Sequence, residues 1–224
     1  MPYLTGMRNS IFGFLVVTLL FVSGTNTLVV AQSWQDSLRF YISIQEQSPK
    51  SIDQLNQFMY RLWQDEHVSD SIINASLEVL DVAAKSNYEK GHADALLNVV
   101  RCYLSRYESS KSLEYALEAS NLYQKIGDSP NYAYTLMQLG IIYYTQNNYA
   151  KSLDYYGQAV TIYSGRGDKE KLSTLYYLMA IDMSGLNRYK DAERNFRLAY
   201  NLKQELKDQQ GMAECETGIA ELLI

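Results

Sequence analysis

The chain has 224 residues, of which 47% are hydrophobic and 20% are charged, a composition typical of a globular protein and not of a disordered one. Twenty tyrosines against three prolines favour long helices packed through aromatic rings. The net charge of -5 is small and the chain has no run of Lys or Arg, so nucleic acid is not an expected partner.

The first 31 residues differ in composition from the rest of the chain. Arg8 is their only charged residue, Ile11 to Val22 is an uncharged stretch of 12 residues, and small side chains precede the bond after Ala31. We expect a secretory signal peptide over residues 1–31, which predicts an exported protein. The alternative is an uncleaved anchor, although the stretch is shorter than the roughly 20 residues that span a bilayer.

The segment after the signal is expected to be helical but irregular. Residues 32–50 predict an N-terminal capping helix that is stopped at Pro49. Ser51 and Gln54 have the spacing of a capping box, which predicts the start of the next helix at Ser51. Residues 51–90 then form a first unit of two helices. Irregular end units are typical of solenoids, because one flank faces water.

Beyond residue 90 the sequence repeats itself with a spacing of forty positions, so that the pair Gly127-Asp128 returns as Gly167-Asp168. Self-similarity at a fixed period predicts a helical-repeat solenoid. We interpret each pair as a turn between units, with glycine ending one helix and aspartate capping the next. The predicted units span residues 91–127, 128–167 and 168–208, with a partial unit at 209–224. Apolar positions that the same shift reproduces are Tyr149 and Tyr189, Tyr156 and Phe196, Ala159 and Ala199, and Ile162 and Leu202.

Small residues recur at one phase of the predicted first helices, at Gly140, Ala180 and Ala220. We expect them to let a neighbouring helix approach closely, while the rings of Tyr156 and Phe196 fill the adjacent space.

Few residues suit catalysis or metal binding. His67 and His92 are the only histidines, they fall in different units, and neither has a Cys or a carboxylate at ligand spacing. Cys102 and Cys215 also fall in separate units, which a solenoid keeps apart, so we expect two free, largely buried thiols. The sequence therefore predicts no enzymatic activity, no metal and no small-molecule cofactor.

The repeated positions resemble the tetratricopeptide repeat (TPR) family, whose two antiparallel helices carry a bulky residue, Leu-Gly, Tyr, Ala, Phe and Ala in turn. The resemblance covers roughly residues 51–224 and implies an all-α, right-handed superhelical solenoid of antiparallel helix pairs. The forty-residue period exceeds the usual 34 and the unit-ending proline is missing, which is similar to the extended TPR subclass. The matching residues are Leu136, Leu139, Gly140, Tyr143, Tyr149, Ser152, Tyr156 and Ala159, and then Tyr176, Met179, Ala180, Tyr189, Ala192, Phe196 and Ala199.

In this family the first helices of successive units line a concave groove. The resemblance therefore implies an aromatic and apolar strip that receives an extended peptide or an amphipathic helix, with Arg101 as a candidate anchor for a carboxylate. The basic clamp of some TPR domains is not expected, because no Lys matches Arg101. The alternative is that superhelical curvature or a following segment covers the strip. The groove residues implied by the resemblance are Leu97, Arg101, Leu104, Tyr134, Met137, Ile141, Tyr144, Tyr177 and Ile181, with the polar Asp94, Thr174 and Ser184 between them.

Two functions follow as expectations. The first is a non-enzymatic protein- or peptide-binding scaffold in the bacterial periplasm or envelope. The second arises because the arrangement is also similar to the exported N-terminal sensor regions of some histidine kinases and adenylate or guanylate cyclases. In that case a membrane helix and a catalytic domain would follow a longer form of this chain. Contact with a membrane is expected only through such a helix or through an uncleaved N-terminal segment.

Overall fold

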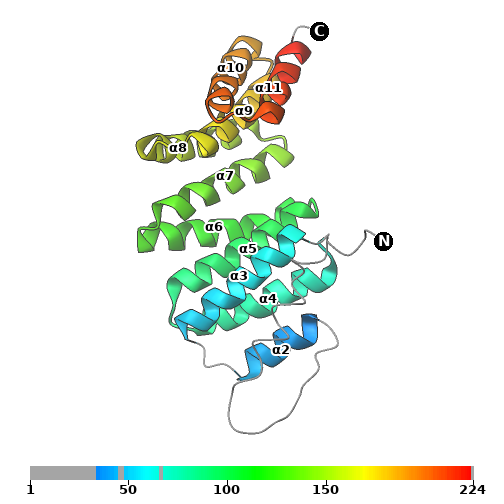
Figure 1. Cartoon of the computed structure of the whole chain (residues 1–224), viewed down its shortest axis with the longest axis vertical. Helices are drawn as coiled ribbons and strands as arrows, with labels where there is room; N and C mark the ends of the chain where they lie inside the picture. Colours follow the sequence, from blue (N-terminus) through cyan, green and yellow to red (C-terminus); the bar gives the residue numbers. More distant parts are fainter. Residues whose placement is uncertain (1–33, 45–47, 66–67, 223–224) are drawn as a thin grey trace, which may run out of the picture.

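The computed structural model describes residues 34–44, 48–65 and 68–222, and every regular element in these ranges is an α-helix (Figure 1). The expected signal peptide at residues 1–31 lies outside the described residues, and so does His67. No helix in the described ranges is both long enough and apolar enough to cross a membrane.

The described helices follow one another along a single stack (Figure 1). Helices α4 to α11 pack mainly against their neighbours in sequence, whereas α3 packs against both α4 and α5, and α5 also touches α7. The nine helices α3 to α11 of the described chain form an antiparallel TPR-like solenoid, with α2 packed on α4, so the predicted all-α solenoid is confirmed. The bounds are α2 Trp34–Ile44, α3 Pro49–Asp65, α4 Asp70–Lys85, α5 Glu89–Ser105, α6 Ser109–Ile126, α7 Ser129–Thr145, α8 Tyr149–Arg166, α9 Lys169–Gly185, α10 Tyr189–Glu205 and α11 Gln209–Glu221.

The turns between helix pairs have the predicted geometry. Gly127 and Gly167 end α6 and α8 in the left-handed region, with φ of 73° and 67°, where a glycine meets no steric penalty from a Cβ. Asp128 and Asp168 then cap the following helices, and the Asp128 side chain accepts a hydrogen bond from the backbone of Asn131 at 3.2 Å. Both glycine-aspartate pairs are therefore inter-unit turns, as predicted.

The predicted start of α3 at Ser51 is wrong, because the helix begins two residues earlier at Pro49. The Ser48 hydroxyl oxygen accepts a hydrogen bond from the Ser51 backbone N–H at 3.3 Å, which is the contact of an N-cap. Proline fits the first helical position because it has no N–H to leave unsatisfied there. The residue that was interpreted as a stop for the preceding helix is thus the start of the next one.

The predicted close packing at Gly140 is confirmed, since a Cβ added there would overlap the ring of Tyr156. Ala180 is fully buried at the same phase one unit later. Ala220 is exposed and its prediction is not tested, because at this phase Gly140 meets the following helix and the described residues include no helix after α11. The opposite side of α11 packs on the preceding helix through Gly218, where an added Cβ would lie 2.5 Å from the Phe196 ring.

Both cysteines, Cys102 and Cys215, are free and buried, as predicted. Burial is the main cause that raises the pKa of each thiol above its usual value, so neither is activated as a nucleophile.

Candidate functional site

A cavity of about 510 Å³ lies between α3, α5 and α7, the first helices of three successive pairs, with Tyr123 contributed by α6. This volume falls within the range of ordinary ligand sites, about 300–1,000 Å³. The lining side chains are mostly polar and are Lys50, Asp53, Gln54, Asn56, Gln57, Tyr60, Lys90, Asp94, Leu97, Asn98, Arg101, Tyr123 and Asn131.

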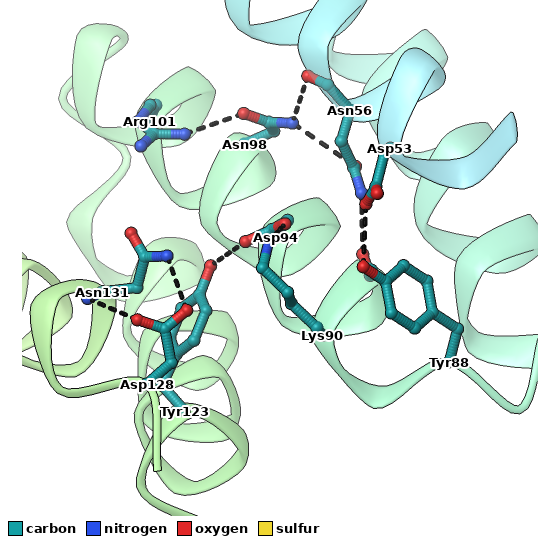
Figure 2. A network of polar contacts seen from close by, with 11 residues as sticks. Asp53, Asn56, Tyr88, Lys90, Asp94, Asn98, Arg101, Tyr123, Asp128 and Asn131 are labelled. Atoms are coloured by element: carbon teal, nitrogen blue, oxygen red, sulfur yellow. Dashed lines mark hydrogen bonds and ion pairs between the residues drawn. The ribbon is translucent and has the colours of Figure 1, made fainter. Parts of the chain in front are cut away.

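Two buried asparagines of this lining join α3 to α5 (Figure 2). The Asn98 amide donates to the backbone oxygen of Asn56 at 3.0 Å, and the Asn56 amide donates to the backbone oxygen of Gly91 at 2.8 Å. Because a buried amide without partners is costly, these bonds fix the position of α3 against α5. The lining is thereby held in place before any ligand arrives.

Arg101 is held between aromatic rings at the edge of the cavity. Its guanidinium carbon lies 4.8 Å from the ring centroid of Tyr60, 5.8 Å from that of Trp63 and 5.2 Å from that of Tyr134, distances at which a cation and a ring attract. Its Nη1 donates to the side-chain oxygen of Asn98 at 2.8 Å (Figure 2). Its Nε is enclosed and has no hydrogen-bond partner.

A second cluster of lining residues provides hydrogen bonds to the carboxylate of Asp94 (Figure 2). Lys90 and the hydroxyl of Tyr123 each donate to one of its oxygens at 2.6 Å. Burial raises the pKa of Tyr123, and the neighbouring Asp94 raises it further, so this phenol stays protonated and donates. Burial lowers the pKa of Lys90, but its hydrogen bond to Asp94 and their mutual attraction raise it overall. The Lys90 ammonium and the Asp94 carboxylate therefore neutralise one another.

The sequence-predicted groove residues are only partly gathered at this cavity. Leu97 and Arg101 line it, and Tyr134 packs on the Arg101 guanidinium. Leu97 and Met137 are 2% and 6% exposed and belong to the hydrophobic core, so they contribute packing and little contact surface. Leu104, Ile141, Tyr177 and Ile181 are half-buried.

Further along the stack, the Tyr144 side chain is 39% exposed, and its ring lies 5.9 Å from that of Tyr149. Tyr177 packs edge-on against Phe196, with ring centroids 5.5 Å apart. The predicted strip thus continues as separate tyrosines on α7 and α9, whereas the residues that line the cavity are mostly of polar types.

Several lining residues escaped the sequence prediction. Lys50, Asn56 and Tyr60 lie on α3, which begins forty residues before α5 but whose residue types match those of the later units poorly, so the resemblance implied no groove residues there. Asn98 stands inside the apolar run from Ala95 to Val100, and its isolation there was the one available signal. A buried amide in such a run has to find hydrogen-bond partners, and these mark contacts between elements.

The chemical groups of the lining are amides, ammonium and guanidinium groups, carboxylates and phenols. Such groups bind a ligand through hydrogen bonds and charge, and Arg101 presents a planar donor to carboxylate or phosphate oxygens. Among the described residues, no group of three His, Cys, Asp or Glu side chains is arranged to hold a metal ion.

Comparison with known proteins identifies the repeats. Residues 91–165 match the model of the tetratricopeptide repeat family. No curated protein sequence matches the chain.

Solved structures with the same arrangement include the apo form of RapI, with a TM-score of 0.69 and 15% identity over 84% of this chain and 72% of RapI. Aspartyl phosphate phosphatase F from Bacillus subtilis has a TM-score of 0.73 and 11% identity over 85% of this chain and 49% of its own. A Rap protein complexed with competence and sporulation factor has a TM-score of 0.56 and 14% identity over 84% of this chain and 56% of its own.

At these identities the likeness shows the fold alone, and the chain spans less than two thirds of the latter two structures. A tetratricopeptide repeat region at residues 91–165 therefore lies inside a longer TPR-like helical solenoid.

Proposed function

We propose that this protein is a non-enzymatic scaffold that binds a segment of another protein, or a peptide, across the first helices of its solenoid. The observation that carries the proposal is the cavity of about 510 Å³ between α3, α5 and α7, whose polar lining is fixed by the hydrogen bonds of Asn56 and Asn98. A preformed site lowers the entropy lost on binding, because its side chains are already ordered.

The shape of the surface favours an extended ligand. First helices succeed one another along the stack, so a segment that enters the cavity can continue over α7 and α9 past the side chains of Tyr144 and Tyr177. The fold supports the same conclusion, since a Rap protein of similar architecture is complexed with competence and sporulation factor.

A random peptide display library tests the proposal directly. Peptides selected on the purified protein are expected to lose affinity for a Tyr60→Ala variant at the cavity rim and for a Tyr144→Ala/Tyr177→Ala variant. A Tyr107→Ala variant serves as the matched control, because Tyr107 is 89% exposed and lies in the turn between α5 and α6. Circular dichroism should show unchanged helix content in all three. Peptides that bind both groove variants as well as the parent protein would contradict the proposal.

The proposal also places the mature protein in the periplasm or envelope, on the strength of the composition of residues 1–31. Expression of the whole chain with a C-terminal tag in a Gram-negative host, followed by fractionation and N-terminal sequencing, is expected to give a periplasmic product that starts at Gln32. A cytoplasmic product that keeps Met1 would contradict the periplasmic location and would leave the binding proposal unaffected. The alternative role as a sensory input region stays a prediction, and the coding sequence beyond Ile224 tests it.

A further inference from the structure

Some of the charged side chains that line the cavity have a partner of opposite charge, and others do not. Three cations, Lys50, Lys90 and Arg101, line it together with two carboxylates, Asp53 and Asp94, which leaves one net positive charge. Asp94 is engaged by Lys90 and by Tyr123, and Asp53 accepts a hydrogen bond from the Tyr88 hydroxyl at 3.0 Å. Within the described part of the chain, Arg101 and Lys50 form no ion pair with a carboxylate.

Arg101 also keeps N–H groups that are free to donate hydrogen bonds to a ligand. Of its guanidinium nitrogens, Nη1 is bonded to Asn98, Nε is enclosed, and Nη2 has no partner among the described residues while Arg101 faces the cavity. The rings of Tyr60, Trp63 and Tyr134 restrict its motion. A guanidinium carries five N–H donors, and a held guanidinium loses little entropy when it binds a planar anion.

We propose that Arg101 makes the cavity a subsite for a carboxylate of an acidic peptide segment. The inference rests on the proposed function and names the chemistry that the ligand must have. The outer edge of the guanidinium, formed by Nη1 and Nη2, receives the two carboxylate oxygens, and Lys50 adds a second positive charge at the rim. The amides of Gln57 and Asn131 belong to the same lining and can both donate to and accept from a peptide main chain.

The charge balance selects a carboxylate over a phosphate. Asp53 and Asp94 remain in the lining, and they repel a doubly charged phosphate group more strongly than a singly charged carboxylate. One net positive charge matches one carboxylate, whereas a phosphate would leave the filled cavity with excess negative charge. The ligand residue in contact with Arg101 is therefore Glu or Asp.

Three fluorescent pools of short peptides with mixed flanking residues test this choice, with a central position fixed as Glu, Gln or phosphoserine. On the parent protein the Glu pool is expected to bind about tenfold more tightly than the Gln pool, the ordinary discrimination of a charge-assisted bidentate pair. This comparison changes only the ligand, so it does not depend on the folding of any variant.

Variants then assign the preference to Arg101. Arg101→Gln should remove the preference for Glu, and Arg101→Lys should keep part of it, since charge remains while the planar fork is lost. Lys151→Gln is the matched control, because Lys151 also stacks on a tyrosine, 4.9 Å from the ring centroid of Tyr143, but lies outside the cavity. The control should keep the full preference.

The outcomes separate this inference from the function on which it rests. Equal binding of the Glu and Gln pools, with affinity that still falls in Tyr60→Ala, would overturn the carboxylate subsite and leave the peptide groove in place. Tighter binding of the phosphoserine pool would overturn the choice of carboxylate. Retention of the Glu preference in Arg101→Gln would overturn the role of Arg101. Binding of none of the pools would count against the groove and the subsite together.

Discussion

Asp182 is a carboxyl group inside the solenoid that ought to destabilise the protein at neutral pH. It lies on α9, its residue is 0% exposed, and neither of its oxygens has a hydrogen-bond partner. Burial raises its pKa from 3.8 to about 6, and the nearby Ser152 hydroxyl lowers it only in part. That hydroxyl has one proton, which it donates to the backbone oxygen of Gly140 at 2.9 Å, so the carboxylate is left without a donor.

The sign and size of the effect follow from this pKa. The folded state binds the Asp182 proton more tightly than the unfolded chain, so the contribution to stability is fully present below pH 3.8 and is lost as the pH rises to about 6. Each pKa unit corresponds to about 1.4 kcal/mol, so ionisation costs about 3 kcal/mol of unfolding free energy above pH 6. An asparagine side chain at this position, being neutral and of similar shape, would avoid this cost.

Urea unfolding of the parent protein and of Asp182→Asn across pH 4 to 8 measures the cost. The variant is expected to gain about 3 kcal/mol relative to the parent at pH 7.5 and little at pH 4, with the difference growing between these limits. Asp154→Asn, at an exposed position of α8, should differ from the parent by less than about 0.5 kcal/mol throughout. A difference between Asp182→Asn and the parent that does not vary with pH would refute the reasoning.

Three further changes test the packing and the turns. Gly140→Ala should lower the unfolding free energy by about 1–3 kcal/mol, because its Cβ overlaps the Tyr156 ring, and the additional change Tyr156→Leu should recover part of the loss. Lys207→Gly should raise the unfolding free energy by about 1 kcal/mol and the thermal midpoint with it, because Lys207 has a φ of 60°, a left-handed conformation that is strained in a residue with a Cβ. An unchanged midpoint would contradict this. Ala159→Asp should lower the unfolding free energy by several kcal/mol, because Ala159 is 0% exposed and the new charge would lack a partner; a midpoint within a degree or so of the parent would show that the assigned register is wrong.

The regular part of the fold was predictable because its units carry the same residue types at the same turn positions. Gly127 and Gly167 stand where the chain needs a positive φ, and Asp128 and Asp168 stand where exposed N–H groups need an acceptor. Prediction failed at Pro49, although the period extends to it: α3, α5, α7, α9 and α11 begin forty residues apart, at Pro49, Glu89, Ser129, Lys169 and Gln209. A proline can either stop a preceding helix or start a following one, and the Ser48 cap shows that here it starts α3.

The candidate site was less predictable, because the position of a residue within the forty-residue period does not determine how deeply its side chain is buried. The repeat places Leu97 and Met137 on the faces of the first helices that meet successive units, and in a solenoid those same faces supply both core and groove. Whether a residue at this phase is enclosed depends on the size of the side chains beside it and on the angle between helices. Neither can be taken from the forty-residue period alone.

A perfectly regular solenoid would have identical surfaces on every unit, so a distinct site has to come from departures from the repeat. Arg101 occupies a phase at which the next two units carry Ile141 and Ile181, whereas the first and last of the described first helices carry Arg61 and Glu221 there. Of the two arginines at this phase, Arg61 is exposed and only Arg101 lines the cavity. Two of the rings that contact Arg101, Tyr60 and Trp63, come from α3, so the cavity lies where the first helix pair, whose residue types follow the repeat poorly, meets the regular pairs. Local departures from a consistent pattern are expected at sites of function, because they cost stability that the rest of the fold supplies. The position of Arg101 therefore supports a binding role more strongly than its charge alone would.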